Sequence, residues 1–392
     1  MRSPVPGGTG ARSRRPRHVE PGAMKICIVS HFAYGAFSGG WGGGVERQTS
    51  RLSRWLAARG HDVTLVTWDE GQAQGICIDG VRIVKVCRLE DGIPGLRFLY
   101  PRWTSLVRAL GMADADLYYH NCAEYVTGQV ALWCRGRGRR FVYSVASDPD
   151  CDPRLPVMKT LRERILYRYG LRRADRIIVQ TRIQQAMLRD GFGLASEVLP
   201  MPYAGPASLP GPGAKKELRV LWVGRFAPEK RLDRLLDIAE ALPHIAFDVA
   251  GGPNRGRTSY TDDLEARARR LANVRLHGIV PHDRMGELYS RASVLCSTSE
   301  YEGFPNTFIE AWSHGVPVLS LVDPDGNISA YELGHVARGT QGLKQAMERI
   351  AGNPDELVRL SARARDFFLD YHQEGIAMAR FEKLFLDLAI RG

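Results

Sequence analysis

The residues with the clearest chemical potential lie between Glu302 and Glu310, two carboxylates eight positions apart. The intervening residues lead into a helical pattern, and Asn306 is a residue type that caps helix N-termini. Backbone N–H groups at a helix N-terminus bind anions. Acids that flank an anion site suit a ligand with both a diphosphate and sugar hydroxyls, because carboxylates accept hydrogen bonds from hydroxyls. Two glutamates on a solvated helix are the alternative.

A cationic turn is the second candidate. Gly224 ends a short apolar run, and Arg225 and Lys230 lie in the turn before the next helical pattern. A guanidinium and an ammonium group at a strand-to-helix turn suit a diphosphate, which carries several negative charges. A solvated basic turn is the alternative that this segment alone leaves open.

A glycine-rich segment at residues 39–44 lies between the first predicted strand and its helix. Glycine lets backbone N–H groups approach an anion, and the following helix N-terminus adds partial positive charge. Gly43 and Gly44 are therefore candidate phosphate contacts. The segment lacks the Gly-Lys-Ser/Thr of a P-loop and the spacing of a dinucleotide-binding fingerprint, so a flexible loop is an equal alternative.

Other catalytic patterns are not recognisable in the sequence. It shows no His-Glu-x-x-His helix, no acidic metal cluster and no Ser/His/Asp order. Asp148, Asp150 and Asp152 resemble a metal-binding run. Because Asp side chains commonly accept hydrogen bonds from turn amides, we instead expect these residues to form a loop beside the acceptor site. The seven cysteines include no Cys-x-x-Cys pair, which argues against a zinc site or disulfide scaffold and for a reducing compartment.

The elements that must position these residues form two α/β units. Apolar, β-branched runs alternate with helical patterns from residue 24, and the alternation restarts near residue 217. We predict domains at residues 24–198 and 217–372, joined by a proline-rich linker at residues 199–216. Residues 1–23 are predicted to be a disordered basic extension, and residues 373–392 an amphipathic helix that packs back on the first domain. Ligands of such sheets bind at the carboxyl ends of the strands, which predicts a cleft between the domains.

The net charge of +11 is unevenly distributed. Residues 1–200 contain 30 Lys and Arg against 18 Asp and Glu (+12), whereas residues 201–392 contain 24 against 25 (−1). Part of the excess lies in residues 155–176, where cations alternate with apolar residues in a helical pattern. A core-packed helix with a solvated basic face is one interpretation, and docking on an anionic membrane is the other. Nucleic acid is not favoured because no recognised binding motif accompanies the charge.

Taken together, the motifs resemble the retaining glycosyltransferases of family 4, which have the GT-B fold: an α/β fold with two Rossmann-like parallel-sheet domains facing a central cleft. The resemblance runs from residue 24 to the last helix. Its most specific part is the acidic pair at residues 302–310 with the Gly-Val-Pro-Val at residues 315–318, and residues 43–48 and 224–231 match two further family motifs.

The resemblance implies a role for each candidate residue. Arg225 and Lys230 would bind the donor's diphosphate and stabilise the departing nucleoside diphosphate. Glu310 would hold the ribose, Glu302 would contact the transferred sugar, and His120 would lie near the sugar or acceptor. The implied catalytic set is Glu302, Arg225, Lys230 and His120. The implied donor-binding set is Gly43, Gly44, Gly224, Arg225, Lys230, Gly278, Ile279, Glu302, Gly303, Phe304, Asn306, Thr307 and Glu310.

The implied reaction is a front-face displacement in which the leaving phosphate accepts the acceptor's proton, so no metal or cofactor is expected. The donor would be a UDP- or GDP-sugar. The acceptor would be a glycan or lipid-linked sugar of surface polysaccharide or glycolipid synthesis, in the cytoplasm or at the inner face of its membrane. A GT-B sugar-nucleotide epimerase or phosphorylase is one alternative, and a basic nucleic-acid-binding protein is another. Residues 323–327 lack the Gly-Gly and Glu common in the family, which leaves the donor sugar open.

Overall fold

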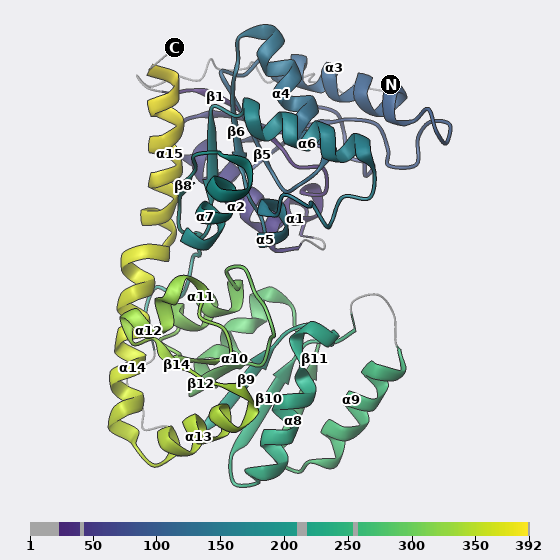
Figure 1. Ribbon diagram of the computed structural model, residues 1–392. Helices are drawn as coiled ribbons and strands as arrows, with labels where there is room; N and C mark the ends of the chain where they lie inside the picture. The colour runs from purple at the N-terminus through teal and green to yellow at the C-terminus, as the bar shows by residue number, and fades with distance from the viewer. Residues whose placement is uncertain (1–22, 40–42, 210–217, 254–257, 391–392) are drawn as a thin grey trace, which may run out of the picture.

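The computed structural model consists of two α/β units stacked one above the other, with the last helices running along one side of both (Figure 1). The structure describes residues 23–39, 43–209, 218–253 and 258–390. Nearly all of the predicted basic extension, the middle of the glycine-rich segment and the end of the predicted linker lie outside these residues.

The N-terminal unit is built on an eight-stranded sheet ordered β3-β4-β2-β1-β5-β6-β7-β8. Neighbouring strands are parallel except β3 and β4, which pair antiparallel. The central strands are apolar runs buried on both faces, as is typical of a parallel sheet covered by helices. The strands are β1 (Lys25–Val29), β2 (Asp62–Thr67), β3 (Cys77–Ile78), β4 (Val81–Lys85), β5 (Leu117–Asn121), β6 (Arg140–Ser144), β7 (Arg176–Val179) and β8 (Glu197–Val198).

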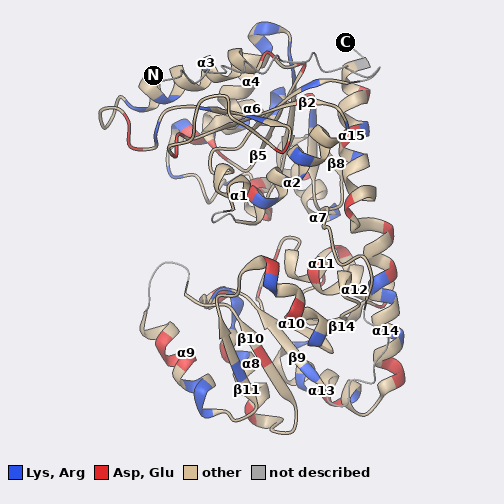
Figure 2. Cartoon of the chain, turned by 180° about the vertical axis from the view of Figure 1, so that it is seen from behind, with Lys and Arg blue, Asp and Glu red and all other residues tan. Residues whose placement is uncertain are grey.

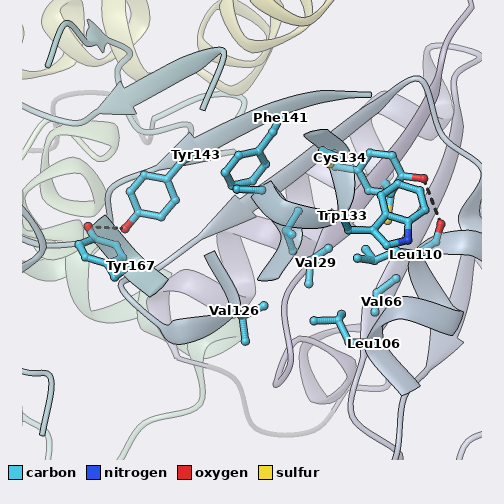
Figure 3. Close-up of a cluster of buried hydrophobic side chains, with 14 of the residues drawn as sticks. Val29, Val66, Leu106, Leu110, Val126, Trp133, Cys134, Phe141, Tyr143 and Tyr167 are labelled. Atoms are coloured by element: carbon cyan, nitrogen blue, oxygen red, sulfur yellow. Dashed lines mark hydrogen bonds between the residues drawn. The ribbon is translucent and has the colours of Figure 1, made fainter. Parts of the chain in front are cut away.

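Helices cover both faces of this sheet. They are α1 (Tyr34–Phe37), α2 (Gly44–Ala58), η1 (Phe98–Trp103), α3 (Thr104–Ala113), α4 (Tyr125–Arg137), α5 (Asp148–Cys151), α6 (Leu161–Arg173) and α7 (Arg182–Phe192). One apolar core includes residues of the sheet and of α3, α4 and α6 (Figure 3). In it the hydroxyls of Tyr143 and Tyr167 form a 3.0 Å hydrogen bond, so this buried polar pair is satisfied.

Helices α4 and α6 approach each other through glycine. A Cβ atom on Gly128 of α4 would lie 2.2 Å from the carbonyl oxygen of Leu166, and one on Gly170 of α6 would lie 2.7 Å from the carbonyl carbon of Thr127. Both positions therefore require glycine, and the contact fixes which side of α6 faces the core.

The C-terminal unit carries an all-parallel six-stranded sheet ordered β11-β10-β9-β12-β13-β14. Its strands are β9 (Arg219–Val223), β10 (Ala246–Ala250), β11 (Val274–Gly278), β12 (Val294–Ser297), β13 (Val318–Ser320) and β14 (Gly334–Val336). Its helices are η2 (Pro228–Lys230), α8 (Leu232–Ala241), α9 (Ser259–Arg270), η3 (His282–Arg284), α10 (Met285–Arg291), α11 (Asn306–Ser313), η4 (Pro324–Gly326), α12 (Asn327–Tyr331), α13 (Gly339–Ala351) and α14 (Pro354–Phe367).

The chain then returns to the N-terminal unit through η5 (Phe368–His372) and α15 (Glu374–Ile390). The side chains of α15 complete the second core of that unit, against residues such as Ile28 and Leu117. Those that contribute are Met378, Phe381, Leu384, Phe385 and Leu388. The two units are thus linked by a helical connection as well as by residues 199–209.

The structure differs from the sequence-based elements in two respects. Strands β3, β4, β8 and β14 lie where no strand was predicted. They are at or next to sheet edges and only partly buried, so they lack the continuous apolar runs of the central strands. The basic helix begins at Leu161 rather than near residue 155, because Thr160 and Glu163 form a capping box. Among the described residues, no helix combines the length and hydropathy that a bilayer span requires.

Candidate active site

Most of the predicted donor residues line one cleft of about 370 Å³. The N-terminal unit contributes Ala146 and Ser147, which follow β6, and the C-terminal unit contributes the carboxyl edge of its sheet. The predicted residues that line it are Gly224, Arg225, Lys230, Glu302, Gly303, Phe304, Asn306 and Thr307. The cationic turn and the acidic loop therefore meet in one place.

Lys230 and Glu302 form the central contact of the cleft. The Lys230 ammonium donates to Glu302 Oε1 in an ion pair whose two side chains are largely buried. Arg225 remains half exposed, and its Nη2 donates to Glu229 Oε1 at 3.1 Å. The cleft thus contains one largely buried and one half-exposed cation, each paired with a glutamate, and the buried one contacts the carboxylate predicted to contact the sugar.

A hydrogen-bond relay fixes the backbone at Lys230. The buried Trp222 Nε1–H donates to Thr298 Oγ1 at 3.0 Å, and the Thr298 hydroxyl donates to the Lys230 carbonyl at 2.8 Å. Trp222 lies on β9 and Thr298 follows β12, which are neighbouring strands. The relay therefore ties the cationic turn to the strand that leads into the Glu302 loop.

Helix α11 begins at Asn306, with Pro305 in the N-cap position and no side-chain cap. The prediction that Asn306 caps this helix is wrong, because proline precedes it and Asn306 is the first helical residue. A helix N-terminus without a side-chain cap suits an anionic ligand, since its first amides lack intrahelical partners. Asn306 and Thr307 at this end line the cleft.

Glu310 lies in a different cavity from Glu302. It is buried, its Oε2 accepts a 2.7 Å hydrogen bond from the Tyr289 hydroxyl, and its Oε1 lies 3.9 Å from His282 Nδ1. Burial raises the pKa of Glu310, and the hydrogen bond and nearby arginines oppose that shift. The cavity between the units is only about 20 Å³ and is lined by Gly44, Arg47, Gln48, Arg51, Met201, Pro202, Tyr203, His282, Asn306, Ile309 and Glu310.

Of the N-terminal residues that line this cavity, sequence reasoning assigned a role to Gly44 but not to Arg47, Gln48 or Arg51. Arg51 Nη2 donates to His282 Nε2 at 3.1 Å, and its guanidinium lies 4.8 Å from the centre of the Tyr203 ring. Burial and the charges of Arg47 and Arg51 lower the pKa of His282 to about 4, so the imidazole is neutral and can accept. Their spacing in the sequence could have identified them, because Arg47 and Arg51 are four residues apart and so lie on the same face of α2.

The two units also meet at the start of α2. Gly43 is the N-cap of α2, and a Cβ atom on Gly44 would lie 2.7 Å from Asn306 Nδ2. The N-termini of α2 and α11 therefore meet, and both carry partial positive charge. This junction is suited to an anion.

Besides Glu310, Gly43 and Gly44, three further predicted site residues do not line the cleft. His120 at the end of β5 is buried, its Nδ1 bonds to the Val29 carbonyl at 2.8 Å, and its Nε2 has no partner among the described residues. Burial lowers the pKa of His120 to about 4. Gly278 ends β11, and Ile279 is exposed with its side chain near Gly252. The structure does not bring these three to Glu302.

Residues 148–151 form the short helix α5 rather than the expected loop. Asp150 does bind turn amides, accepting from Ala146 N at 2.9 Å and Ser147 N at 3.2 Å, and burial raises its pKa to about 6. Asp148 accepts from Gln184 Nε2 at 3.0 Å. Burial raises the pKa of Asp148, and the negative charges of Asp325 and Glu302 raise it further.

The segment that departs from the family pattern connects the two units. The Asp325 carboxylate of the C-terminal unit accepts from the backbone N–H of Arg182 at 2.5 Å and of Ile183 at 3.1 Å. These amides open α7 of the N-terminal unit, so Asp325 caps a helix of the other unit. Within the described ranges, no group of three or more His, Cys, Asp or Glu is arranged to hold a metal ion.

Two family models match the chain in sequence. A glycosyl transferase 4-like domain matches residues 43–204, and glycosyl transferases group 1 matches residues 210–367. The chain is 31% identical over 165 residues to an alpha-galactosylglucosyldiacylglycerol synthase of Streptococcus pneumoniae, covering 40% of this chain and 42% of that protein. It is 25% identical over 315 residues to the amylovoran biosynthesis glycosyltransferase AmsD of Erwinia amylovora, covering 74% of this chain and 83% of that protein.

The matches to GtfA subunits of streptococcal UDP-N-acetylglucosamine–peptide N-acetylglucosaminyltransferases span only 33% to 40% of those proteins. Solved structures match over nearly the whole chain. A sucrose-phosphate synthase from Thermosynechococcus elongatus has a TM-score of 0.73 at 20% identity, covering 94% of this chain and 99% of that one. Anabaena Alr3699/HepE in complex with UDP-glucose has a TM-score of 0.70 at 17% identity, covering 92% and 99%. These likenesses confirm the predicted GT-B fold.

Proposed function

The chain belongs to the group 1 glycosyltransferases, and on that premise we propose a retaining enzyme that moves a sugar from a UDP- or GDP-sugar to a glycan or lipid-linked acceptor. One observation carries the proposal: Arg225, Lys230 and Glu302 meet in a single cleft at the carboxyl edge of the C-terminal sheet. Two cations suit a diphosphate, and the carboxylate suits sugar hydroxyls.

The cations act on the leaving group. As the bond between sugar and phosphate breaks, negative charge develops on the nucleoside diphosphate, and Arg225 and Lys230 stabilise it. Lys230 exchanges Glu302 for a phosphate oxygen when donor binds, which releases the Glu302 carboxylate to accept from a sugar hydroxyl. The paired N-termini of α2 and α11 add positive charge, so the reaction proceeds without a metal ion.

Donor entry requires the units to separate. The cavity beside Glu310 has room for about one water molecule, far less than a ribose needs. We therefore assign ribose recognition to a more open state in which α2 stands further from Glu310.

The acceptor enters from the N-terminal unit, beside Ser147 and Asp148. Its hydroxyl attacks from the face that the phosphate leaves, and a phosphate oxygen takes the proton, so no protein base is required. Relatives named for a glycolipid and for amylovoran support a lipid-linked or polysaccharide acceptor, and HepE in complex with UDP-glucose supports a UDP-sugar donor. We place the reaction in the cytoplasm, at the inner face of the cytoplasmic membrane.

A panel of UDP-, GDP-, ADP- and dTDP-sugars tests the proposal by thermal shift and by slow hydrolysis of the donor, with and without EDTA. One UDP- or GDP-sugar is expected to raise the melting temperature and be cleaved regardless of EDTA, with Glu302→Gln abolishing cleavage. Binding by no donor, or a strict need for Mn²⁺ or Mg²⁺, would overturn it. Interconversion of the donor without acceptor would instead identify an epimerase, and turnover with free phosphate a phosphorylase.

A further inference from the structure

Large apolar side chains are exposed in two neighbouring segments of the N-terminal unit. Among the described residues, ten such side chains are more than half exposed, and seven of the ten lie at residues 93–100 and 157–165. The seven are Ile93, Leu96, Leu99, Tyr100, Val157, Leu161 and Ile165. We call this set the apolar face.

The packing of α6 explains the exposure. Tyr167, Gly170 and Leu171 are the buried residues of α6, and Gly170 makes the close approach to α4. Leu161 and Ile165, near the start of the helix, consequently point away from the core and are 71% and 56% exposed. The interpretation as a core-packed helix with a solvated basic face thus fits the second half of α6, whereas Leu161 and Ile165 in its first half do not pack on the core.

The two segments form one surface. The Arg162 guanidinium of α6 lies 3.8 Å from the centre of the Phe98 ring in η1, so the start of α6 is held against the segment that carries Leu99 and Tyr100. Figure 1 shows both segments on the same side of the N-terminal unit.

Cations outnumber acids around the apolar face: residues 88–102 and 157–165 together contain six Lys and Arg against three Asp and Glu. Helix α6 contains five arginines and one acid, Glu163, whose carboxylate is engaged with the backbone N–H groups of Lys159 and Thr160. Lys159 and Arg162 are exposed beside Leu161. The acids of the neighbouring loop are Glu90 and Asp91, and they lie close to η1, because the carbonyl of the adjacent Leu89 accepts from Arg102 Nη2 at 2.7 Å. Over α15, by contrast, acidic and basic residues are interspersed (Figure 2).

We propose that the apolar face docks the enzyme on an anionic lipid bilayer. Its apolar side chains enter the boundary between headgroups and acyl chains, and its cations contact lipid phosphates. A second copy of the chain is a poor partner for this surface, because symmetric association would bring like charges together. Nucleic acid would leave the apolar side chains exposed to water.

Docking serves the proposed function by supplying the acceptor. In the sequence, only α5 and the five residues after it separate Ser147, which lines the cleft, from Val157 of the apolar face. Docking of this segment therefore brings the bilayer to the unit from which the acceptor is proposed to enter. Only this role in supplying the acceptor rests on the proposed function. Binding of the chain to lipid vesicles is measured without donor or acceptor.

Vesicle co-sedimentation of the full chain tests the proposal, with vesicles of phosphatidylglycerol plus phosphatidylcholine against phosphatidylcholine alone. Binding is expected only to the anionic vesicles and to weaken with salt. Leu161→Ser and Ile165→Ser should each weaken it about tenfold, and Lys159→Ala about fivefold. The matched controls are Val358→Ser on α14 and Lys383→Ala on α15, both exposed, which should bind like the wild type.

No binding to anionic vesicles, or equal binding by Leu161→Ser and Val358→Ser, would overturn the proposal. Sedimentation velocity supplies a second test, because dissociation of a wild-type dimer by Leu161→Ser would show the face to be an interface between copies. Donor hydrolysis in solution should be unchanged in all these variants, since none alters the cleft. Loss of vesicle binding with hydrolysis intact therefore separates failure of docking from failure of the proposed function.

Discussion

Gly44 and Asn306, from different units, are so close that a Cβ atom on Gly44 would stand 2.7 Å from Asn306 Nδ2. Alanine at position 44 is compatible with α2, because it is the first helical residue, but its Cβ atom displaces the Asn306 side-chain amide from the place where the two helix N-termini meet. Gly44→Ala is therefore expected to raise KM for the donor about tenfold without lowering the melting temperature. Steady-state kinetics with a donor titration measures this.

Gly136→Ala is the matched control for that substitution. Gly136 is a helical residue of α4, and a Cβ atom there would meet nothing within 4 Å. It should leave KM unchanged and stabilise α4 slightly. An equal KM for Gly44→Ala and the wild type would show that the close approach has no part in donor binding.

Removing the Lys230 ammonium should slow donor cleavage. Lys230→Gln leaves Glu302 without its ion-pair partner and removes one of the positive charges that stabilise the leaving diphosphate. Loss of one such stabilising donor lowers kcat by about 10²–10³-fold. Lys344→Gln, which breaks the Lys344–Glu348 pair in the same unit, should leave kcat unaltered. Turnover by Lys230→Gln within a few-fold of wild type would remove Lys230 from the mechanism.

The contact of Asp325 with α7 should hold the units together. Asp325→Ala deletes acceptors for the Arg182 and Ile183 amides, so we expect a larger radius of gyration by small-angle scattering in the absence of donor. Asp323→Ala is the control, because Asp323 accepts from the amides of Ile328 and Ser329 within its own unit. It should cost about 1 kcal/mol of stability without changing the radius. Identical scattering from both variants would rule out the proposed connection.

Features that depend on neighbouring residues in the sequence could be predicted, whereas contacts between residues far apart in the sequence could not. Apolar runs and a glycine or proline at their ends act locally, so both parallel sheets and the Glu302 loop could be predicted. The Arg51–His282 contact could not, because it joins residues 231 positions apart across two domains. Helix α6 shows the same limit. The spacing of its apolar residues predicts a helix, but the glycine contact with α4 decides which of those residues are buried.

The site divides in the same way. Motif position indicated Arg225, Lys230 and Glu302, which the structure brings together in one cleft. It also placed Glu302 and Glu310 on either side of an anion site, and the two line separate cavities that share Asn306. His120 was predicted from its position at the end of a strand. It is buried and does not line the cleft, and sequence periodicity alone does not predict the burial of a single residue.

The buried state of His120 predicts a pH dependence of stability. Its pKa is about 4 in the folded protein and near 6.5 when unfolded, so the unfolded chain takes up a proton as the pH falls below 6.5. Stability from this group is therefore full above pH 6.5 and is lost toward pH 4, on the order of 3 kcal/mol in all. His120→Asn, which keeps a donor for the Val29 carbonyl, should show a flatter loss of unfolding free energy in urea titrations. Parallel pH curves for the two proteins would contradict this.

The most direct test of the account compares how the protein binds a nucleoside diphosphate and the corresponding nucleoside, measured by calorimetry in EDTA. If Arg225 and Lys230 recognise the diphosphate, the wild type will bind the diphosphate at least tenfold more tightly than the nucleoside. Arg225→Gln and Lys230→Gln will each reduce that ratio severalfold while leaving nucleoside affinity nearly unchanged. An unchanged ratio in both variants would contradict the assignment of the cleft as the donor diphosphate site.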